Sequence, residues 1–384
     1  MKSENQSPAP LSSRLSRRTF FSQCSAAAGK VASSAVAAPL VIAAELDGSV
    51  GKKLRLGLLG VGQQGLKWAG AILENQGLSL AGWYDPDLNQ MEKAAGMLER
   101  RGFNLPKPAS SENCIWENSE IDAVIIASPS HLHFRQILKS IENGQHVLAE
   151  KPLGMSSAEF NEIQSLLQVN EKVVLMSAFS RRYSGHRRAL LEWLKAEPLG
   201  RMLGVDVCWN QPQGPRQGWH GWMMDVARTG DWVAEHGDQI WDLLFELRPG
   251  MLPAVVKAVR KAGRDQPSRY FSAVLEYSDG VMTHVRHSLL PGGNFQSPGL
   301  SFLIQYEKGM VDLMSGRISG QIKPGTPKFE IDRAEDELNA MLIAFNGRIH
   351  AKPIEITVAN SDELQRYHNI LQLRNEISER FLEL

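Results

Sequence analysis

The segment KLRLGLLGVGQQG, residues 53–65, constrains the fold more than any other stretch of the chain. It begins with a short apolar run, typical of a buried strand, and continues into a G-x-G-x-x-G motif at Gly60, Gly62 and Gly65. The first glycine permits a tight turn, the second lets the backbone approach a pyrophosphate, and the third lets the next helix pack closely. A helix over residues 66–75 would offer free N–H groups to phosphates. The segment therefore predicts a dinucleotide-binding Rossmann domain.

The acid at the end of the second apolar run predicts which dinucleotide binds. LSLAGWYD ends at Asp85, about 20 residues beyond the glycine motif, where such folds place an acid that binds the adenosine ribose. An acid there repels a 2′-phosphate, so the sequence favours NAD over NADP. The alternative role for Asp85 is that of a helix cap or turn residue before Pro86.

Two further strands are predicted within residues 121–154. AVIIA reads as a buried strand, SPSHLH as the loop at its carboxyl end, residues 134–143 as a helix, and HVLA as the next strand. Alternating strands and helices indicate a doubly wound sheet, which binds ligands at the carboxyl ends of its strands. Lys151 is thus expected where a nicotinamide ring would lie, although a lysine at a strand end is by itself a modest signal. The other candidate cofactor contacts are Ser128, Pro129, His133 and Glu150.

GVGQQG, Asp85, AVIIASPSHLH and HVLAEKPLG, in this order and spacing, resemble the glucose–fructose oxidoreductase/inositol dehydrogenase (Gfo/Idh/MocA) family over most of residues 52–250. The resemblance implies an α/β fold: a Rossmann domain at 52–180, a second α/β domain with an open, mostly antiparallel sheet at 181–360, and a C-terminal helix at 361–384 that packs back on the first domain. It also implies a nicotinamide cofactor, a sugar or polyol substrate and a homo-oligomer. The matching family lysine assists proton transfer, and this role would fall to Lys151.

The start of the second domain supplies candidate substrate contacts. Arg181, Arg182 and Tyr183 resemble the family segment that enters this domain, and they could equally be a solvated, basic helix start. Trp219 and Trp222 lie in a glycine-rich loop, and flat aromatic faces suit sugar rings. We therefore expect Arg182, Tyr183, Trp219 and Trp222 on the substrate side.

GDWVAEHGDQIWD, residues 230–242, is the most polar candidate. Placed on one helix over residues 230–247, it aligns Glu235, Gln239 and Asp242 along one stripe. The pattern alone favours a stripe turned to water, whereas the resemblance places it at the active site. Family members carry an acid, a histidine four residues later and an aspartate three residues after that. Here Gln239 replaces the histidine and cannot exchange protons, which leaves His236 or Glu235 as the proton acceptor.

The charge balance and the histidine spacing exclude other classes of function. Lys plus Arg equals Asp plus Glu at 42 each, so nothing favours nucleic acid or an anionic membrane surface. Three cysteines give no disulfide framework. His284 and His287 lie three apart on a predicted strand, so they point to opposite faces. No metal site is predicted.

Residues 1–45 resemble a twin-arginine export signal. Arg17, Arg18 and Phe20 match that signal, and an Ala/Ser-rich run interrupted by Lys30 and Pro39 follows. This run is too weakly apolar for an integral membrane span. We expect a periplasmic protein exported by this route and cleaved within residues 38–44; the alternatives are a disordered tail or a helical anchor.

Together these features predict an NAD-dependent oxidoreductase that takes hydride from a carbinol carbon of a sugar, polyol or glycoside. One alternative is a glycoside hydrolase or lyase that holds NAD tightly and recycles it. Another is a sugar-binding protein without catalytic activity.

Overall fold

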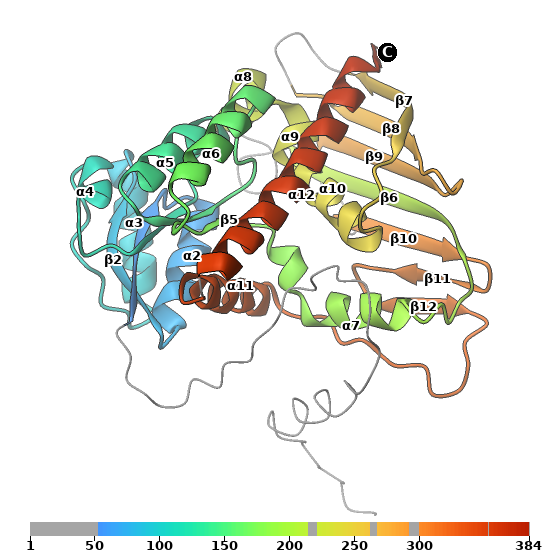
Figure 1. The fold of residues 1–384 in the computed structure, drawn as a ribbon, viewed down its shortest axis with the longest axis horizontal. Coiled ribbons are helices and arrows are strands. Elements are labelled where there is room, and N and C mark those ends of the chain that lie inside the picture. Colours follow the sequence, from blue (N-terminus) through green and yellow to red (C-terminus); the bar gives the residue numbers. More distant parts are fainter. Residues whose placement is uncertain (1–52, 214–220, 262–266, 292–298, 352, 384) are drawn as a thin grey trace, which may run out of the picture. The chain divides into compact units, whose positions relative to one another are not determined.

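Five parallel strands form the first sheet, in the order β2–β1–β3–β4–β5 (Figure 1). The computed structural model describes residues 53–213, 221–261, 267–291, 299–351 and 353–383, so the predicted export signal lies outside the described residues. The strands are β1 Leu54–Leu59, β2 Leu78–Tyr84, β3 Ala123–Ile126, β4 His146–Ala149 and β5 Leu175–Ser177, and the helices between them are α2 Gln63–Glu74, α3 Leu88–Glu99, α4 Asn113–Trp116, α5 Ser130–Glu142 and α6 Ser157–Val169.

Alternation along the strands explains why helices cover both faces of this sheet. Ala123 and Ile125 pack with α2 and α3 on one face, whereas Val124 and Ile126 pack with α5 and α6 on the other. All four residues are fully buried. A strand that is apolar on both faces is typical of a doubly wound sheet, so the predicted Rossmann fold is confirmed. Helix α11, Ala334–Ile349, which the sequence did not predict, also packs on the α2 face.

Eight strands form the second sheet, in the order β12–β11–β10–β6–β9–β8–β7–β13. Only the pairs β6–β9 and β7–β13 are parallel, which confirms the open, mostly antiparallel sheet. The predicted hairpin is β8–β9, with Gly280 at φ +81° in its turn. The strands are β6 Met202–Gln213, β7 Ala254–Lys261, β8 Tyr270–Glu276, β9 Met282–Pro291, β10 Leu300–Tyr306, β11 Gly309–Asp312, β12 Arg317–Gly320 and β13 Phe381–Glu383.

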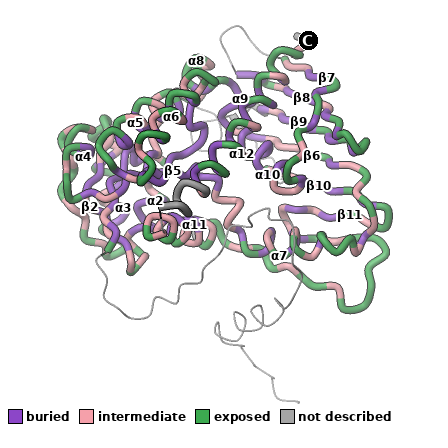
Figure 2. The backbone as a smooth tube through the Cα atoms, viewed as in Figure 1, coloured by how far each residue is buried: buried purple, intermediate pink, exposed green. Residues whose placement is uncertain are grey.

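Burial alternates along strands of the second sheet (Figure 2), so one face is buried and the other is open. His287 on β9 is buried and His284 is exposed, so the two histidines do point to opposite faces. The covering elements are α9 Asp231–Glu235, α10 Gly237–Leu247 and α12 Pro353–Glu379. The remaining elements are η1 Ser180–Tyr183, α7 Gly185–Leu194, η2 Gly221–Met224 and α8 Val226–Thr229. Every helix among the described residues is too short or too polar to cross a membrane.

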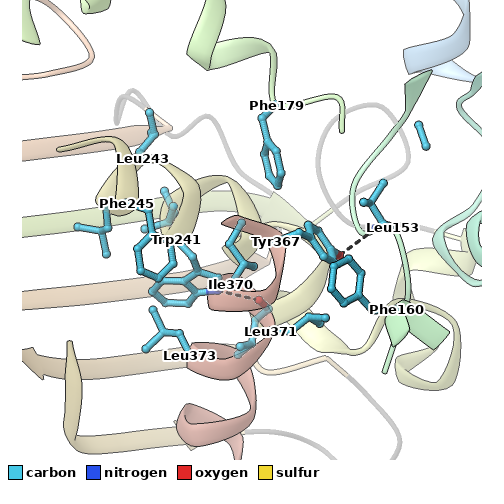
Figure 3. Close-up of a cluster of buried hydrophobic side chains, with 14 of the residues drawn as sticks. Leu153, Phe160, Phe179, Trp241, Leu243, Phe245, Tyr367, Ile370, Leu371 and Leu373 are labelled. Carbon is cyan, nitrogen blue, oxygen red and sulfur yellow. Dashed lines mark hydrogen bonds between the residues drawn. The ribbon is translucent and has the colours of Figure 1, made fainter. Parts of the chain in front are cut away.

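Helix α12 joins the two sheets. Its Asn360 bonds to the backbone of Val173 and Leu175 at the edge of the first sheet, at 2.7 and 3.1 Å. Tyr367 accepts a hydrogen bond from Leu153 N–H at 2.8 Å and packs against Phe160 (Figure 3). The helix therefore packs back on the first domain. It begins earlier than expected, and residues 381–383 leave it as a strand paired with β7.

Two other predicted boundaries are also wrong. Helix α5 begins at Ser130, so most of SPSHLH belongs to its first turn instead of a loop. The single helix predicted over residues 230–247 is two helices, α9 and α10, separated at His236. Both corrections place polar side chains at helix ends, where backbone groups and side chains of other segments can reach them.

Candidate active site

The glycine motif has the geometry that its spacing predicts. Gly60 follows β1 with φ +88°, and a Cβ there would lie 2.6 Å from Ala127 O. A Cβ on Gly65 would overlap the carbonyl oxygen of Gly60. Only glycine fits at these two positions, because the turn needs a left-handed residue and the helix packs directly on it.

Gly62 meets a different requirement. It precedes α2, which begins without a side-chain cap, and a Cβ on Gly62 would meet nothing within 4 Å. The N–H groups of the first turn of α2 therefore adjoin open space. A pyrophosphate fits this arrangement, because it accepts hydrogen bonds from N–H groups and is favoured at the positive end of a helix.

Asp85 lies against the glycine motif at the end of β2. Its Oδ2 accepts a hydrogen bond from Val61 N–H at 2.9 Å, and its Oδ1 accepts one from Asp87 N–H at 3.0 Å. Asp85 is therefore a turn residue, as the alternative interpretation proposed. It also lies beside the glycine turn, and its role in binding the adenosine ribose stays a prediction. The cap of α3 is Asp87.

His133 ties together the segments that follow β3 and β4. Its Nε2 lies 2.8 Å from Ser128 O and its Nδ1 lies 2.8 Å from Pro152 O. Ser128 Oγ donates to Gln136 Oε1 at 2.5 Å, and Pro129 directly precedes α5. Both ring nitrogens of His133 thus bind the protein itself, and the contacts give this residue a positioning role.

Lys151 lies two residues beyond the strand β4 and is buried against Glu235 of α9. Its Nζ donates to the backbone oxygen of Glu235 and lies 3.3 Å from Glu235 Oε1. Burial alone would lower the pKa of Lys151, but Glu235, Glu150 and Asp238 outweigh it and the pKa is raised. Lys151 is therefore an ammonium ion at neutral pH. Glu150 itself accepts a hydrogen bond from Trp68 Nε1 at 2.9 Å, which anchors it to α2.

Both carboxylate oxygens of Glu235 are engaged. Lys151 lies at Oε1, and Ser130 Oγ donates to Oε2. Ser130 begins α5, so the positive end of that helix also favours the negative charge of Glu235. The sequence interpretation missed Ser130, and its place within SPSHLH was the available signal. The structure thus joins SPSHLH, EKPLG and GDWVAEHGDQIWD in one buried cluster.

The break between α9 and α10 lets Lys151 bind the backbone. In an unbroken helix the Glu235 carbonyl would accept from the N–H four residues later, which is that of Gln239. Instead Gln239 N–H donates to His236 O at 3.2 Å, and Lys151 takes the Glu235 carbonyl. The polar stripe is therefore turned inward, since Glu235 and Asp242 are 5% and 1% exposed.

His236 lies at the break, half-buried. Its ring centroid is 5.2 Å from that of Trp209. Burial, and then the positive charge of Lys151, hold the pKa of His236 well below its ordinary value. The imidazole is therefore neutral and able to accept a proton.

The predicted substrate contacts separate into different environments. Arg182 bonds to Asp242 Oδ1 at 2.6 Å and to Glu363 Oε2 at 2.9 Å, so it holds η1 to α10 and α12 instead of facing a substrate. Tyr183 OH lies 3.4 Å from Met176 Sδ, within the first domain. Gln239 Oε1 accepts from Arg181 Nε at 3.3 Å. Trp222 lies half-exposed in η2, and Trp219 lies outside the described residues.

Asp238 is a second residue that the sequence interpretation missed. It is fully buried, and burial raises its pKa to about 6 despite Arg374 and Lys151. Its Oδ2 accepts a hydrogen bond from Tyr367 OH at 3.2 Å. Because the same hydroxyl accepts from Leu153 N–H, Asp238 and Tyr367 hold the turn that follows Lys151. In the sequence Asp238 lies beside Gln239 but off the predicted polar stripe.

Residues 54–178 match the oxidoreductase family Gfo/Idh/MocA, described as an NAD-binding Rossmann fold. The match supports the resemblance over the first domain. Inositol 2-dehydrogenase 4 of Saccharopolyspora erythraea is 33% identical over 154 residues, covering 40% of this chain and 44% of that protein. An uncharacterized oxidoreductase of Streptococcus pneumoniae is 26% identical over 277 residues, 70% of this chain and 71% of that protein. The chain thus spans less than half the length of the first relative.

Solved structures show the same fold over nearly their whole length. A 3-ketoreductase from Actinomadura kijaniata, solved with NADP, has a TM-score of 0.70 at 14% identity and covers 87% of this chain and 99% of its own. An NAD-binding protein from Listeria innocua has a TM-score of 0.66 at 20% identity, with coverages of 86% and 97%. At these identities the likeness establishes the two-domain fold, and the neighbours include both NADP and NAD binders.

Proposed function

We propose that this chain, with the NAD-binding domain of the Gfo/Idh/MocA oxidoreductases, is a dehydrogenase that oxidises a hydroxyl group of a sugar, polyol or glycoside. The observation that carries the proposal is the buried pair of Lys151 and Glu235. Lys151 follows β4 at the carboxyl edge of the same sheet as the glycine motif, where doubly wound sheets bind dinucleotides. The inositol 2-dehydrogenase relative supports a polyol-like substrate.

Bound nicotinamide would supply the hydride acceptor, and this chain's own side chains would handle the proton. The Lys151 ammonium would donate a hydrogen bond to the reacting hydroxyl and stabilise negative charge on its oxygen. Glu235 holds the ammonium in place through Oε1 and its backbone carbonyl. Ser130 fixes the other oxygen of Glu235, so the carboxylate keeps one orientation.

We assign proton acceptance to His236. Glu235 has both oxygens engaged, whereas the His236 ring is neutral and lies within the electrostatic reach of Lys151. A lowered pKa makes the imidazole a weak base, so transfer to it must be coupled to hydride loss from the substrate carbon. Gln239 would orient a polar group of the substrate.

We further propose NAD as the cofactor, because the Asp85 carboxylate lies beside the glycine motif and disfavours a 2′-phosphate. Homo-oligomerisation through the open face of the second sheet and periplasmic location by the twin-arginine route are also proposals. Replacing Arg17 and Arg18 with lysine should leave precursor in the cytoplasm, and normal export of that variant would contradict the route.

A direct test uses the full chain purified folded, a panel of sugars, polyols and glycosides, and added NAD. Absorbance of NADH measures net oxidation, and product analysis measures bond cleavage. Net NADH formation that is lost in Lys151→Met supports the dehydrogenase. Glycoside cleavage without net NADH would assign a hydrolase or lyase that recycles its NAD, and ligand binding without turnover would assign a sugar-binding protein.

A further inference from the structure

Two neighbouring arginines, Arg181 and Arg182, are both half-buried, but the charges around them differ. Arg182 lies against the carboxylates of Asp242 and Glu363. Arg181 instead donates to the neutral oxygen of Gln239 at 3.3 Å and lies 3.4 Å from Met314 Sδ. Among the described residues, Arg181 makes no ion pair.

The surroundings of Arg181 leave its charge poorly compensated. Burial, and then the positive charge of Arg187, lower the pKa of Arg181 to about 10. Glu337 acts in the other direction, but it pairs directly with Arg187. A half-buried guanidinium without a carboxylate beside it is less stable than a paired one, so an anion bound at Arg181 would offset part of its desolvation cost.

Arg181 belongs to the same site as the proposed catalytic residues. It shares Gln239 with α10, and it is close enough to His236 that its charge contributes to the lowered pKa of the imidazole. Lys151, by contrast, is balanced by Glu235. Within the described residues, the site therefore carries one uncompensated positive charge next to the proposed proton acceptor.

We propose that the substrate is a carbohydrate acid whose carboxylate binds Arg181 and the side-chain amide of Gln239. This inference rests on the proposed dehydrogenase function and names its substrate class. Because Gln239 Oε1 accepts from Arg181, its Nε2 is oriented as a donor for a second carboxylate oxygen. A guanidinium fork matches a planar carboxylate. The single charge of the Arg181 guanidinium matches that of one carboxylate. A phosphate ester carries nearly two negative charges and would leave one uncompensated.

The test compares matched pairs of neutral sugars and their acids, namely glucose with glucuronate, galactose with galacturonate and mannose with mannuronate. Each is assayed for NADH formation and titrated into the NAD-saturated full chain by calorimetry. We expect wild type to prefer the acid of at least one pair. Arg181→Gln should lower the acid-to-neutral ratio of kcat/KM by about 10- to 100-fold, the range for a charge-assisted hydrogen bond. Arg181→Lys should restore part of it.

Two further variants keep the inference falsifiable. Gln239→Glu places a carboxylate on Arg181 and should abolish the preference for acids without unfolding the protein, even if Arg181→Gln does not fold. Arg201→Gln, on an exposed side chain paired with Glu307, is the matched control and should leave the ratio unchanged. A wild type that neither binds nor oxidises acids better than neutral sugars overturns the inference, while NADH from neutral sugars leaves the dehydrogenase standing. Acid binding that depends on Arg181 but occurs without turnover would support the carboxylate site and contradict the dehydrogenase.

Discussion

The candidate site has two halves, and each would bind its ligand by different means. The half from the first sheet is made of backbone: glycines that allow a turn, and a helix whose first N–H groups adjoin open space. The half from α9, α10 and η1 is made of buried charges, most of them paired with residues more than 50 positions away. The comparison teaches that local spacing suffices to specify a phosphate-binding turn, whereas a charged pocket depends on which distant partners fold against it.

The largest expected effect distinguishes the two adjacent arginines. Arg182→Gln leaves Asp242 and Glu363 with one cation fewer between them, and breaking a buried pair costs about 3–5 kcal/mol. Arg181→Gln removes an uncompensated cation and should leave the free energy of unfolding unchanged or raise it. Urea denaturation of both variants measures the difference. Equal loss of stability in the two variants would show that Arg181 is compensated after all.

The next effect concerns the proton acceptor. His236→Ala should lower kcat by about 10² to 10⁴, the usual worth of a positioned acid or base, while NAD binding stays intact. Glu235→Gln is the paired variant. It should lower kcat mainly because Lys151 loses the carboxylate that holds it in place. A His236→Ala protein that turns over like wild type would leave this helix junction with no role in proton transfer.

Substitutions in the glycine motif have a smaller expected effect, and two of them should change different properties. A Cβ at Gly62 meets no protein atom within 4 Å, so Gly62→Ala should fold normally. It should weaken NAD binding about 5- to 150-fold, the range for about 1–3 kcal/mol of overpacking. Gly65→Ala places its Cβ on Gly60 O and should instead lower thermal stability. Calorimetric titration with NAD and thermal melting separate the two effects. If Gly62→Ala binds NAD as wild type does, the pyrophosphate does not approach this turn.

The smallest expected effect is on cofactor choice. Asp85→Asn keeps an acceptor for Val61 N–H but removes the charge, and it should weaken NAD relative to NADP by about 10-fold, as expected for a hydrogen bond to a charged group. The ratio of dissociation constants for the two dinucleotides measures it. A wild type that binds both equally would contradict the role given to Asp85.

The sequence by itself determined the Rossmann strands, the glycine turn, Asp85 and the strand-end position of Lys151. These features depend on periodicity and on spacings of a few residues, so they are visible in one linear stretch. It also marked residues 230–242 as unusual, and Glu235, His236 and Gln239 do lie together with Lys151 or Arg181.

Only the tertiary structure decided what each polar group contacts. The sequence could not show that Ser130 fixes Glu235 or that Lys151 takes a carbonyl freed by a helix break. Nor could it show that, within the described part of the chain, Arg182 has carboxylate partners while Arg181 has only a neutral one. The physical reason is that the energy of a buried charge depends on partners brought together from distant positions. Neighbouring residues of the same type can therefore have opposite roles, and composition and spacing do not distinguish them.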